Sequence, residues 1–99
     1  MTTFPVSIIT PNGVIFKGDT EFLSAPGVEG SFGILAKHAP FVTLLLKGIV
    51  KVVSQEQAKF FAIAKGILEV NGKGDVLLLA SYAASFDEKT KAQEALSKL

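Results

Sequence analysis

The segment "GILAKHAPFVTLLLKG" (residues 33–48) contains His38, the only histidine of the chain, directly before an Ala-Pro pair and a run of apolar residues. A proline restricts the residue before it to extended backbone, so Ala39-Pro40 predicts a strand from Phe41 to Leu46. His38 is then expected in the loop that leads into this strand. On residue type alone its side chain has three candidate roles: a catalytic base, a metal ligand, or an architectural group held by backbone hydrogen bonds.

Short apolar runs separated by glycine or proline extend outward from this segment and occupy the chain up to about residue 84. This pattern is typical of strands joined by turns. Residues 21–25 (EFLSA) and 48–53 (GIVKVV) alternate, so their successive side chains are expected on opposite faces of a sheet. Residues 60–64 (FFAIA) and 76–80 (VLLLA) lack strict alternation, which predicts strands covered on both faces.

Two polar segments are predicted to be hairpin loops, residues 54–59 (SQEQAK) and 70–76 (VNGKGDV). Short strands at this spacing predict a mainly β chain, an antiparallel β-sandwich of roughly ten short strands. We assign residues 1–84 to this β-sandwich domain.

The remaining residues, 85–99 (SFDEKTKAQEALSKL), change in composition to Ala, Glu, Lys and Leu and predict one short C-terminal α-helix. Ser85 followed by Glu88 matches a capping box, and Asp87 is a competing N-cap. Four apolar positions fall on one helix face: Ala92, Ala95, Leu96 and Leu99. A helix of about 13 residues is marginal alone, so we expect it to depend on docking against the sandwich.

The composition argues against several classes of function. With one histidine and no cysteine, a His- or Cys-based metal site is not expected, and the nine carboxylates show no calcium-loop spacing. No serine stands in a nucleophile-elbow pattern, so catalysis through His38 is not indicated. The formal net charge is +1 and all ten basic residues are lysine, which argues against a nucleic-acid partner. We expect no cofactor and no metal.

The apolar runs are too short to cross a membrane. The longest near the end, Val76–Phe86, is well below the roughly 20 residues that a spanning helix needs. The first residues carry no charge before Lys17, so the basic leading region of a signal peptide is missing. We therefore expect no direct membrane insertion and no targeting segment.

A glycine-rich piece, "GVEGSFG" (residues 27–33), resembles a phosphate-binding loop only superficially. Its spacing matches neither the dinucleotide fingerprint nor the P-loop, and a strand rather than a helix is expected next. Tight turns that need positive φ at Gly27, Gly30 and Gly33 are the better interpretation.

Two spaced blocks carry a family resemblance. The segment "VEGSFGILAKHAPFVTLLLKGIV" (residues 28–50) closely resembles a signature of the ε subunit of the F-type rotary ATP synthase. The matching residues are Gly30, Gly33-Ile34, His38-Ala39-Pro40, Thr43, Leu45 and Gly48. The segment "FAIAKGILEVNG" (residues 61–72) is similar to a second family region, through Phe61, Gly66, Glu69, Val70 and Asn71. With a third block at "DVLLLASYA" and "FDE", the resemblance covers residues 4–88.

The chain departs from the family pattern in its turns. Ala36 and Lys47 stand where the family usually has proline, and Lys65 replaces the first glycine of a Gly-Gly pair. Four residues are expected to remain as structural turn positions, with the glycines needed wherever φ is positive. They are Gly33, Pro40, Gly48 and Gly66.

A larger departure lies at the C-terminal end. The family continues into a two-helix arm that can inhibit ATP hydrolysis, whereas this sequence has room for one short helix before Leu99. The family motif Ile/Leu-Asp-x-x-Arg-Ala, which is associated with an ATP site in some members, becomes Phe86–Lys91 without the arginine. We therefore expect no nucleotide binding, and arm-based inhibition is not carried over.

The resemblance implies a non-catalytic subunit in the central stalk of a proton-translocating ATP synthase, joining the γ subunit to the ring of c subunits. It places Thr10, His38 and Thr43 at the γ subunit, whereas on residue type alone each could equally be a strand-end residue without a partner. The c-ring contact falls on the turn Glu29-Gly30-Ser31, which could equally be an ordinary solvated turn. The expected location is peripheral, on the cytoplasmic side of a bacterial inner membrane or the stromal side of a plastid membrane.

Two other classes of function stay open at this point. A stand-alone β-sandwich module that binds a peptide or a small apolar ligand would also account for the missing catalytic groups. An enzyme would require a pocket with convergent polar groups. Neither alternative explains the two spaced blocks.

Overall fold

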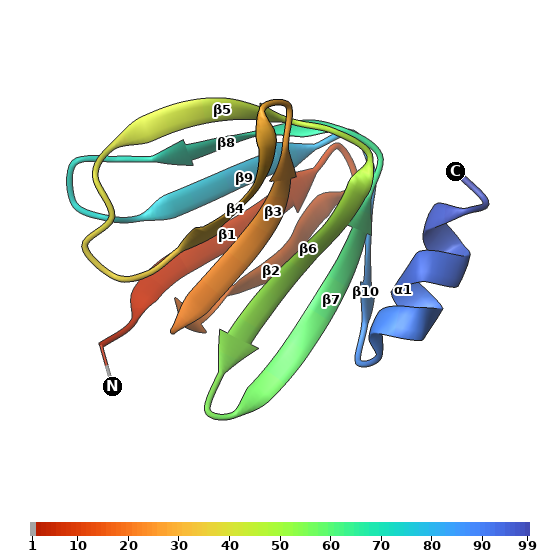
Figure 1. Cartoon of the computed structure of the whole chain (residues 1–99), viewed down its shortest axis with the longest axis horizontal. Coiled ribbons are helices and arrows are strands. Elements are labelled where there is room, and N and C mark those ends of the chain that lie inside the picture. The colour runs from red at the N-terminus through yellow and green to blue at the C-terminus, as the bar shows by residue number, and fades with distance from the viewer. Residues whose placement is uncertain (1) are drawn as a thin grey trace.

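Ten strands and one helix make up residues 2–99, the part of the chain that the structure, a computed structural model, describes (Figure 1). The elements in chain order are β1 (Phe4–Thr10), β2 (Gly13–Thr20), β3 (Phe22–Gly27), β4 (Gly30–Ile34), β5 (Phe41–Leu45), β6 (Gly48–Ser54), β7 (Gln57–Ile63), β8 (Gly66–Val70), β9 (Val76–Ala80), β10 (Ala83–Phe86) and α1 (Lys89–Leu96). The predicted mainly β architecture with one short C-terminal helix is confirmed.

The strands form one sheet that folds over on itself into a sandwich. Their order is β10-β7-β6-β3-β5-β8-β9-β1-β2, and β4 pairs only with β3. Strand β3 joins the two layers, because Phe22–Ser24 pair with β6 whereas Gly27 pairs with Leu45 of β5. At the far side, β2 contacts β6 and β10 across the core. The sandwich is therefore confirmed, with one difference from a purely antiparallel arrangement: β1 lies parallel to β9.

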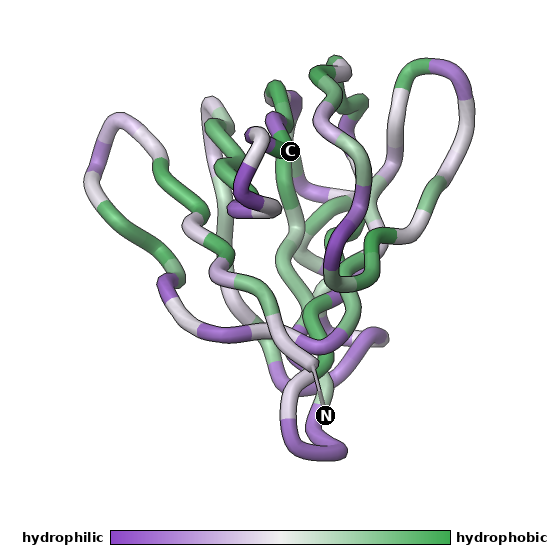
Figure 2. The backbone as a smooth tube through the Cα atoms, turned by 90° about the vertical axis from the view of Figure 1, so that its left-hand side faces the viewer, coloured by the Kyte–Doolittle hydropathy of each residue, from purple (hydrophilic) through white to green (hydrophobic). Residues whose placement is uncertain are grey.

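The core is built by the alternation that the sequence indicates. Leu23 and Ala25 of β3 and Val50 and Val52 of β6 are buried, while their neighbours along each strand are partly exposed. Phe61 lies at the centre, fully buried and edge-on to Phe16 with ring centroids 5.5 Å apart. Figure 2 shows hydrophobic and hydrophilic residues interspersed along much of the chain, with hydrophilic residues gathered in the lowest loop of the view.

The prediction that residues 60–64 and 76–80 are covered on both faces is half right. In β7, Phe61, Ala62 and Ile63 are all buried, since the core lies on one side and α1 contacts the other. In β9, however, the burial alternates and Leu79 is 43% exposed, so the prediction for residues 76–80 is wrong. An apolar side chain on the outer face of a sheet has the same sequence signature as one that another layer covers.

Both predicted hairpins are present, but the first loop is shorter than expected. Strand β6 continues to Ser54 and β7 begins at Gln57, so only Gln55 and Glu56 form the turn, with φ of 52° and 63°. Positive φ at both central residues gives the turn a twist that matches the flanking strands. In the second hairpin, the Asn71 side-chain oxygen accepts hydrogen bonds from the backbone N–H groups of Lys73 and Asp75 at 2.8 and 3.0 Å.

The helix start differs from the prediction. Ser85 lies in β10, where it pairs with Phe61 of β7, so the capping box between Ser85 and Glu88 is wrong. Strand pairing takes precedence over the local cap. Glu88 is the N-cap and makes no side-chain capping bond, and Asp87 is not the cap either. The division of the chain after residue 84 stays a prediction.

The helix docks with the face that its periodicity predicts. Ala92 is fully buried and Ala95 and Leu96 are half-buried, on a helix that contacts β6, β7 and β10. Leu99 follows the helix and is 45% exposed, so it does not belong to the docked face. Figure 1 shows α1 on the β7–β10 side, away from β5, β8 and β9. Those three strands keep an outer surface that the helix does not cover.

Candidate functional site

The outer surface of strands β5, β8 and β9 is apolar. The strand register sets Leu44, Ile67 and Leu79 side by side in one row. A second row contains Val42, Glu69 and Leu77. Val28 and Leu46 extend the surface at the end of β5. We call these residues, without Glu69, the apolar face: Val28, Val42, Leu44, Leu46, Ile67, Leu77 and Leu79.

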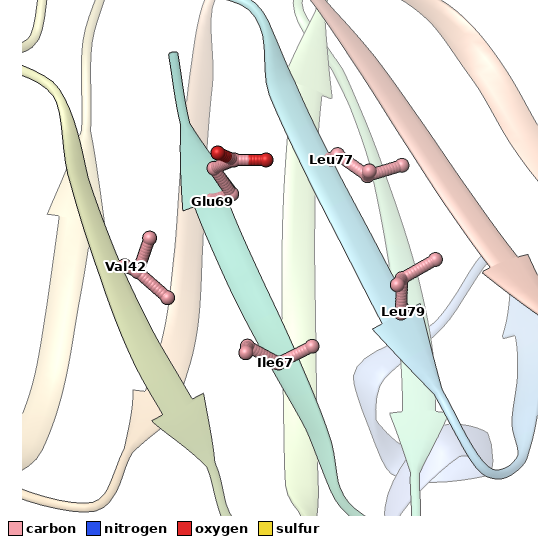
Figure 3. A pocket seen from close by; sticks show the side chains of 5 residues that line it. All are labelled: Val42, Ile67, Glu69, Leu77 and Leu79. Atoms are coloured by element: carbon pink, nitrogen blue, oxygen red, sulfur yellow. The ribbon is translucent and has the colours of Figure 1, made fainter.

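The apolar face is exposed to solvent to an unusual degree. Val42, Leu44 and Leu46 are 60%, 57% and 52% exposed, and Ile67 and Leu79 are 38% and 43% exposed. Two adjoining hollows of about 270 and 580 Å³ lie on it, and the smaller one is lined by Val42, Ile67, Glu69, Leu77 and Leu79 (Figure 3). Contiguous exposed apolar surface of this kind marks a site where another molecule binds. The apolar face is therefore the first candidate interface.

Sequence patterns alone did not identify this surface. Its signal is present in β8 and β9, where apolar residues occupy the outward positions Ile67, Leu77 and Leu79 in addition to the inward ones. In β9 this signal predicted a covered strand, because a second layer and a binding partner require the same side chains.

A third hollow, a depression of about 390 Å³, lies between the β3–β4 hairpin and the start of β5. It brings the turn residues Glu29, Gly30 and Ser31 together with His38 and Thr43. Residues that the resemblance assigns to two different partners, the c-ring and the γ subunit, thus line one hollow. Glu29 to Ser31 are exposed, whereas His38 and Thr43 are half-buried.

The hairpin tip is anchored to β5 by main-chain hydrogen bonds. The Val28 N–H donates to the Leu44 carbonyl oxygen at 3.0 Å, and the Leu46 N–H donates to the Pro26 carbonyl oxygen at 2.8 Å. Gly30 has φ of 125°, which only glycine adopts readily, so the positive-φ interpretation is confirmed at this position. The exposed turn at residues 28–30 is therefore held in place by the strand that carries the apolar face.

His38 makes the contacts of an architectural residue. Its Nδ1 lies 2.7 Å from the Ala39 carbonyl oxygen, and since a carbonyl only accepts, Nδ1–H is the donor. The ring packs against Phe41 with centroids 4.9 Å apart. Among residues 2–99 there is no group of three or more His, Asp or Glu side chains placed to hold a metal ion. Pro40 follows in the loop before β5, as expected.

Thr10 lies apart from His38 and Thr43. It ends β1, three strands away from β5, and its side chain closes the turn into β2. Its Oγ1 accepts a hydrogen bond from the Asn12 N–H at 3.2 Å and donates to the Gly13 carbonyl oxygen at 3.4 Å. The structure therefore brings together only two of the three residues that the resemblance assigns to the γ subunit.

At three of the predicted turn positions, glycine is required for a different structural reason. Gly33, Gly48 and Gly66 lie in strands, and their φ angles are not in the positive region. The positive-φ interpretation is therefore wrong for Gly33, and the condition attached to Gly48 and Gly66 is not met. The same correction applies to Gly27. A Cβ at Gly33 would lie 2.8 Å from the Phe22 ring, and one at Gly66 would collide with the Leu79 carbonyl oxygen. Close packing between strands, rather than turn geometry, excludes a side chain here.

Within the described residues, no helix is both long and apolar enough to span a lipid bilayer. The one helix, α1, has eight residues.

Residues 3–85 match the family model described as the ATP synthase, Delta/Epsilon chain, beta-sandwich domain. The chain is 39% identical over 87 residues to ATP synthase epsilon chain 2 of Nitrobacter hamburgensis, a match that covers 88% of this chain but only 63% of that protein. It is also 39% identical over 83 residues to the ATP synthase epsilon chain of Caulobacter vibrioides, covering 84% of this chain and 95% of that protein. The chain thus spans less than two thirds of the Nitrobacter relative.

Two solved structures share the fold. One chain of the Euglena gracilis mitochondrial ATP synthase, in a structure of its OSCP/F1/c-ring part, superposes with a TM-score of 0.80 at 22% identity, covering 99% of this chain and 64% of that chain. One chain of the Tetrahymena thermophila mitochondrial ATP synthase central stalk and c-ring gives a TM-score of 0.69 at 18% identity, covering 99% and 93%.

Proposed function

The chain belongs to the family of the ATP synthase delta/epsilon β-sandwich domain, and from this membership we propose that it is a central-stalk (rotor) subunit of an F-type ATP synthase. In this role it couples the γ subunit to the c-ring during proton-driven ATP synthesis. The family match over residues 3–85 is the observation that carries the proposal. The named relatives are epsilon chains, and the two similar folds come from ATP synthase assemblies.

We assign the γ subunit to the apolar face. The face offers exposed side chains on three adjacent strands, as a protein interface core does. Covering it removes apolar area from water, which stabilises the complex by roughly 25 cal/mol per Å² before the costs of association. Thr43 lies on β5 between Val42 and Leu44, with its side chain on the opposite face of the strand, and His38 lies in the loop before β5. Both residues therefore adjoin the strand that borders the apolar face. Thr10 ends β1, the strand next to β9 on the other border.

The c-ring contact is assigned to the turn Glu29-Gly30-Ser31. The turn is exposed, and the hydrogen bonds from Val28 to Leu44 and from Leu46 to Pro26 fix it to the strand that meets the γ subunit in this proposal. A force applied at the turn would then pass into β5 through main-chain bonds rather than through a mobile loop. This arrangement suits a piece that transmits torque between two partners.

In this role the chain carries no catalytic group, cofactor or nucleotide of its own. It is held at an energy-transducing membrane through the complex rather than by insertion. The cytoplasmic or stromal side follows from the family resemblance.

Binding of the purified chain to the γ subunit from the same source tests the assignment. Leu44→Asp sets a charge in the centre of the apolar face at a position that is 57% exposed, so the fold should be retained. We expect the affinity for γ to fall at least ten-fold, or about 1.4 kcal/mol. Leu99→Asp is the matched control, because Leu99 is 45% exposed and follows α1 instead of lying on β5, β8 or β9.

If wild type and Leu44→Asp bind γ equally well, the γ contact lies outside the apolar face. No binding of the folded wild-type chain to γ at low or moderate salt would remove the rotor proposal. The apolar hollow of about 580 Å³ would then favour the second candidate, a stand-alone sandwich that binds a small apolar ligand.

A further inference from the structure

Glu69 is the one charged residue in the three strands that form the apolar face. The strand sequences are FVTLL in β5, GILEV in β8 and VLLLA in β9. Glu69 lies in the middle strand, where the register sets it directly between Val42 and Leu77. Figure 3 shows its carboxylate on the same surface as the side chains of Val42, Ile67 and Leu79, where it lines the smaller hollow.

Among residues 2–99, the strand register sets no lysine directly beside this carboxylate. Both cross-strand neighbours of Glu69 are apolar, and so is Ile67, the preceding residue on the same face of β8. The closest lysines in sequence, Lys65 and Lys73, are each four residues away and lie outside the strand. Lys65 lies in the bend before β8 and Lys73 in the turn after it, and neither belongs to the row of Val42, Glu69 and Leu77.

Covering the apolar face would remove water from around Glu69. A desolvated carboxylate without a partner strongly opposes binding, whereas one that meets a cation with good geometry does not. A tight complex on this face therefore requires a complementary charge at that point. Arginine suits the position best, because its planar fork binds a carboxylate through two parallel hydrogen bonds.

We propose that Glu69 pairs with a basic side chain of the protein that covers the apolar face, and that this pair sets the register of docking. The inference rests on the proposed function, which assigns the γ subunit to this face, and it adds the chemistry of the partner. A partner with an apolar or acidic group opposite Glu69 is rejected, because it leaves the carboxylate buried without compensation. The apolar rows provide the contact area, and the single charge discriminates between partners.

Two substitutions at Glu69 separate this proposal from a purely apolar interface. Glu69→Gln keeps the shape and removes the charge, while Glu69→Leu removes the charge and enlarges the apolar area. A purely apolar interface predicts that Glu69→Leu binds more tightly than wild type. A charge pair predicts that both variants bind at least about ten-fold more weakly, because each leaves the partner's cation unpaired.

The experiment measures the Kd of the full chain for the γ subunit from the same source, at low and moderate salt. Glu56→Gln is the matched control, because Glu56 lies exposed in the β6–β7 turn, outside the apolar face. We expect less than two-fold change for the control. We also expect the affinity of Glu69→Gln to fall less steeply with salt than that of wild type, since one charge contact is lost.

Leu44→Asp distinguishes failure of the inference from failure of the proposed function. If Leu44→Asp loses binding while both Glu69 variants bind as wild type or tighter, the docking face stands and the charge pair is overturned. If Leu44→Asp and the Glu69 variants all bind as wild type, the face is not the γ contact and the inference is overturned with it. Unfolding midpoints confirm that each variant is folded.

Discussion

Gly48, at the start of β6, lies directly against the ring of Pro26 in β3. A Cβ atom added at Gly48 would come within 2.7 Å of Pro26 Cγ and 2.8 Å of Pro26 Cβ. Carbon atoms pack at about 3.5–4.0 Å, so the two strands could not keep this approach. The contact lies where β3 passes from its partner β6 to its partner β5, the point that joins the two layers of the sandwich.

Gly48→Ala should therefore destabilise the fold. The added methyl group must push β6 away from a rigid proline ring, and overpacking of this kind typically costs about 1–3 kcal/mol in the free energy of unfolding. Urea denaturation followed by circular dichroism measures the loss. Gly72→Ala is the control, because a Cβ at Gly72 meets nothing within 4 Å. A Gly48→Ala variant as stable as Gly72→Ala would show that the strands separate without cost.

Thr20→Val should keep or raise stability. Thr20 is fully buried, and its Oγ1 has no hydrogen-bond partner among the described residues. A buried hydroxyl without a partner costs roughly 1–3 kcal/mol, and valine has nearly the same shape without that cost. We expect the free energy of unfolding to rise by about 1 kcal/mol in the same urea assay. Thr10→Val should instead lower it, because it removes the hydrogen bonds in the β1–β2 turn. A destabilised Thr20→Val would contradict the assignment of an unpaired hydroxyl.

Truncation at the C-terminal end should distinguish the helix from the last strand. A chain that ends at Glu88 loses α1, which buries Ala92 fully and only half-buries Ala95 and Leu96. We expect a folded sandwich with an unfolding free energy lower by about 2 kcal/mol.

A chain that ends at residue 84 also loses two residues of β10, Ser85 and Phe86, and their pairing with β7. It should be distinctly less stable than the longer truncation, as thermal unfolding of the two would show. Equal stability would mean that the sandwich ends at residue 84, as the sequence pattern predicts.

His38→Ala should weaken binding to the γ subunit less than about ten-fold and should leave the fold intact. The substitution removes the ring contact with Phe41 and the hydrogen bond to the Ala39 carbonyl oxygen, and the His38 side chain that makes them is only half-buried. Aromatic contacts of this type are worth about 0.5–1.5 kcal/mol. His38→Phe retains a ring against Phe41 and should recover most of any loss of stability. Calorimetry of binding together with thermal unfolding measures both effects. Global unfolding of His38→Ala would mean that the histidine is part of the core.

Part of the candidate site could be predicted from the sequence, because it depends on residues that are neighbours in the chain. The Ala39-Pro40 pair places His38 in a loop and begins the strand at Phe41, and Gly30 is needed for its positive φ. The depression lined by Glu29, His38 and Thr43 could not be predicted in this way, because it depends on how the β3–β4 hairpin packs against β5. The sequence patterns also gave no indication that Thr10 lies three strands away from Thr43.

Alternation, turn residues and composition by themselves determined a mainly β sandwich, two of its hairpins and a short C-terminal helix, because these features depend on residues close together in the chain. Only the tertiary structure decided that Leu79 faces outward on an uncovered strand, that Ser85 pairs in β10 instead of capping the helix, and that Gly48 lies against Pro26. Each of these depends on which strand lies next to which, and long-range pairing is not encoded in any single window of the sequence. The apolar face belongs to this second group: an outward leucine becomes a binding surface only where no other layer of the same chain covers it.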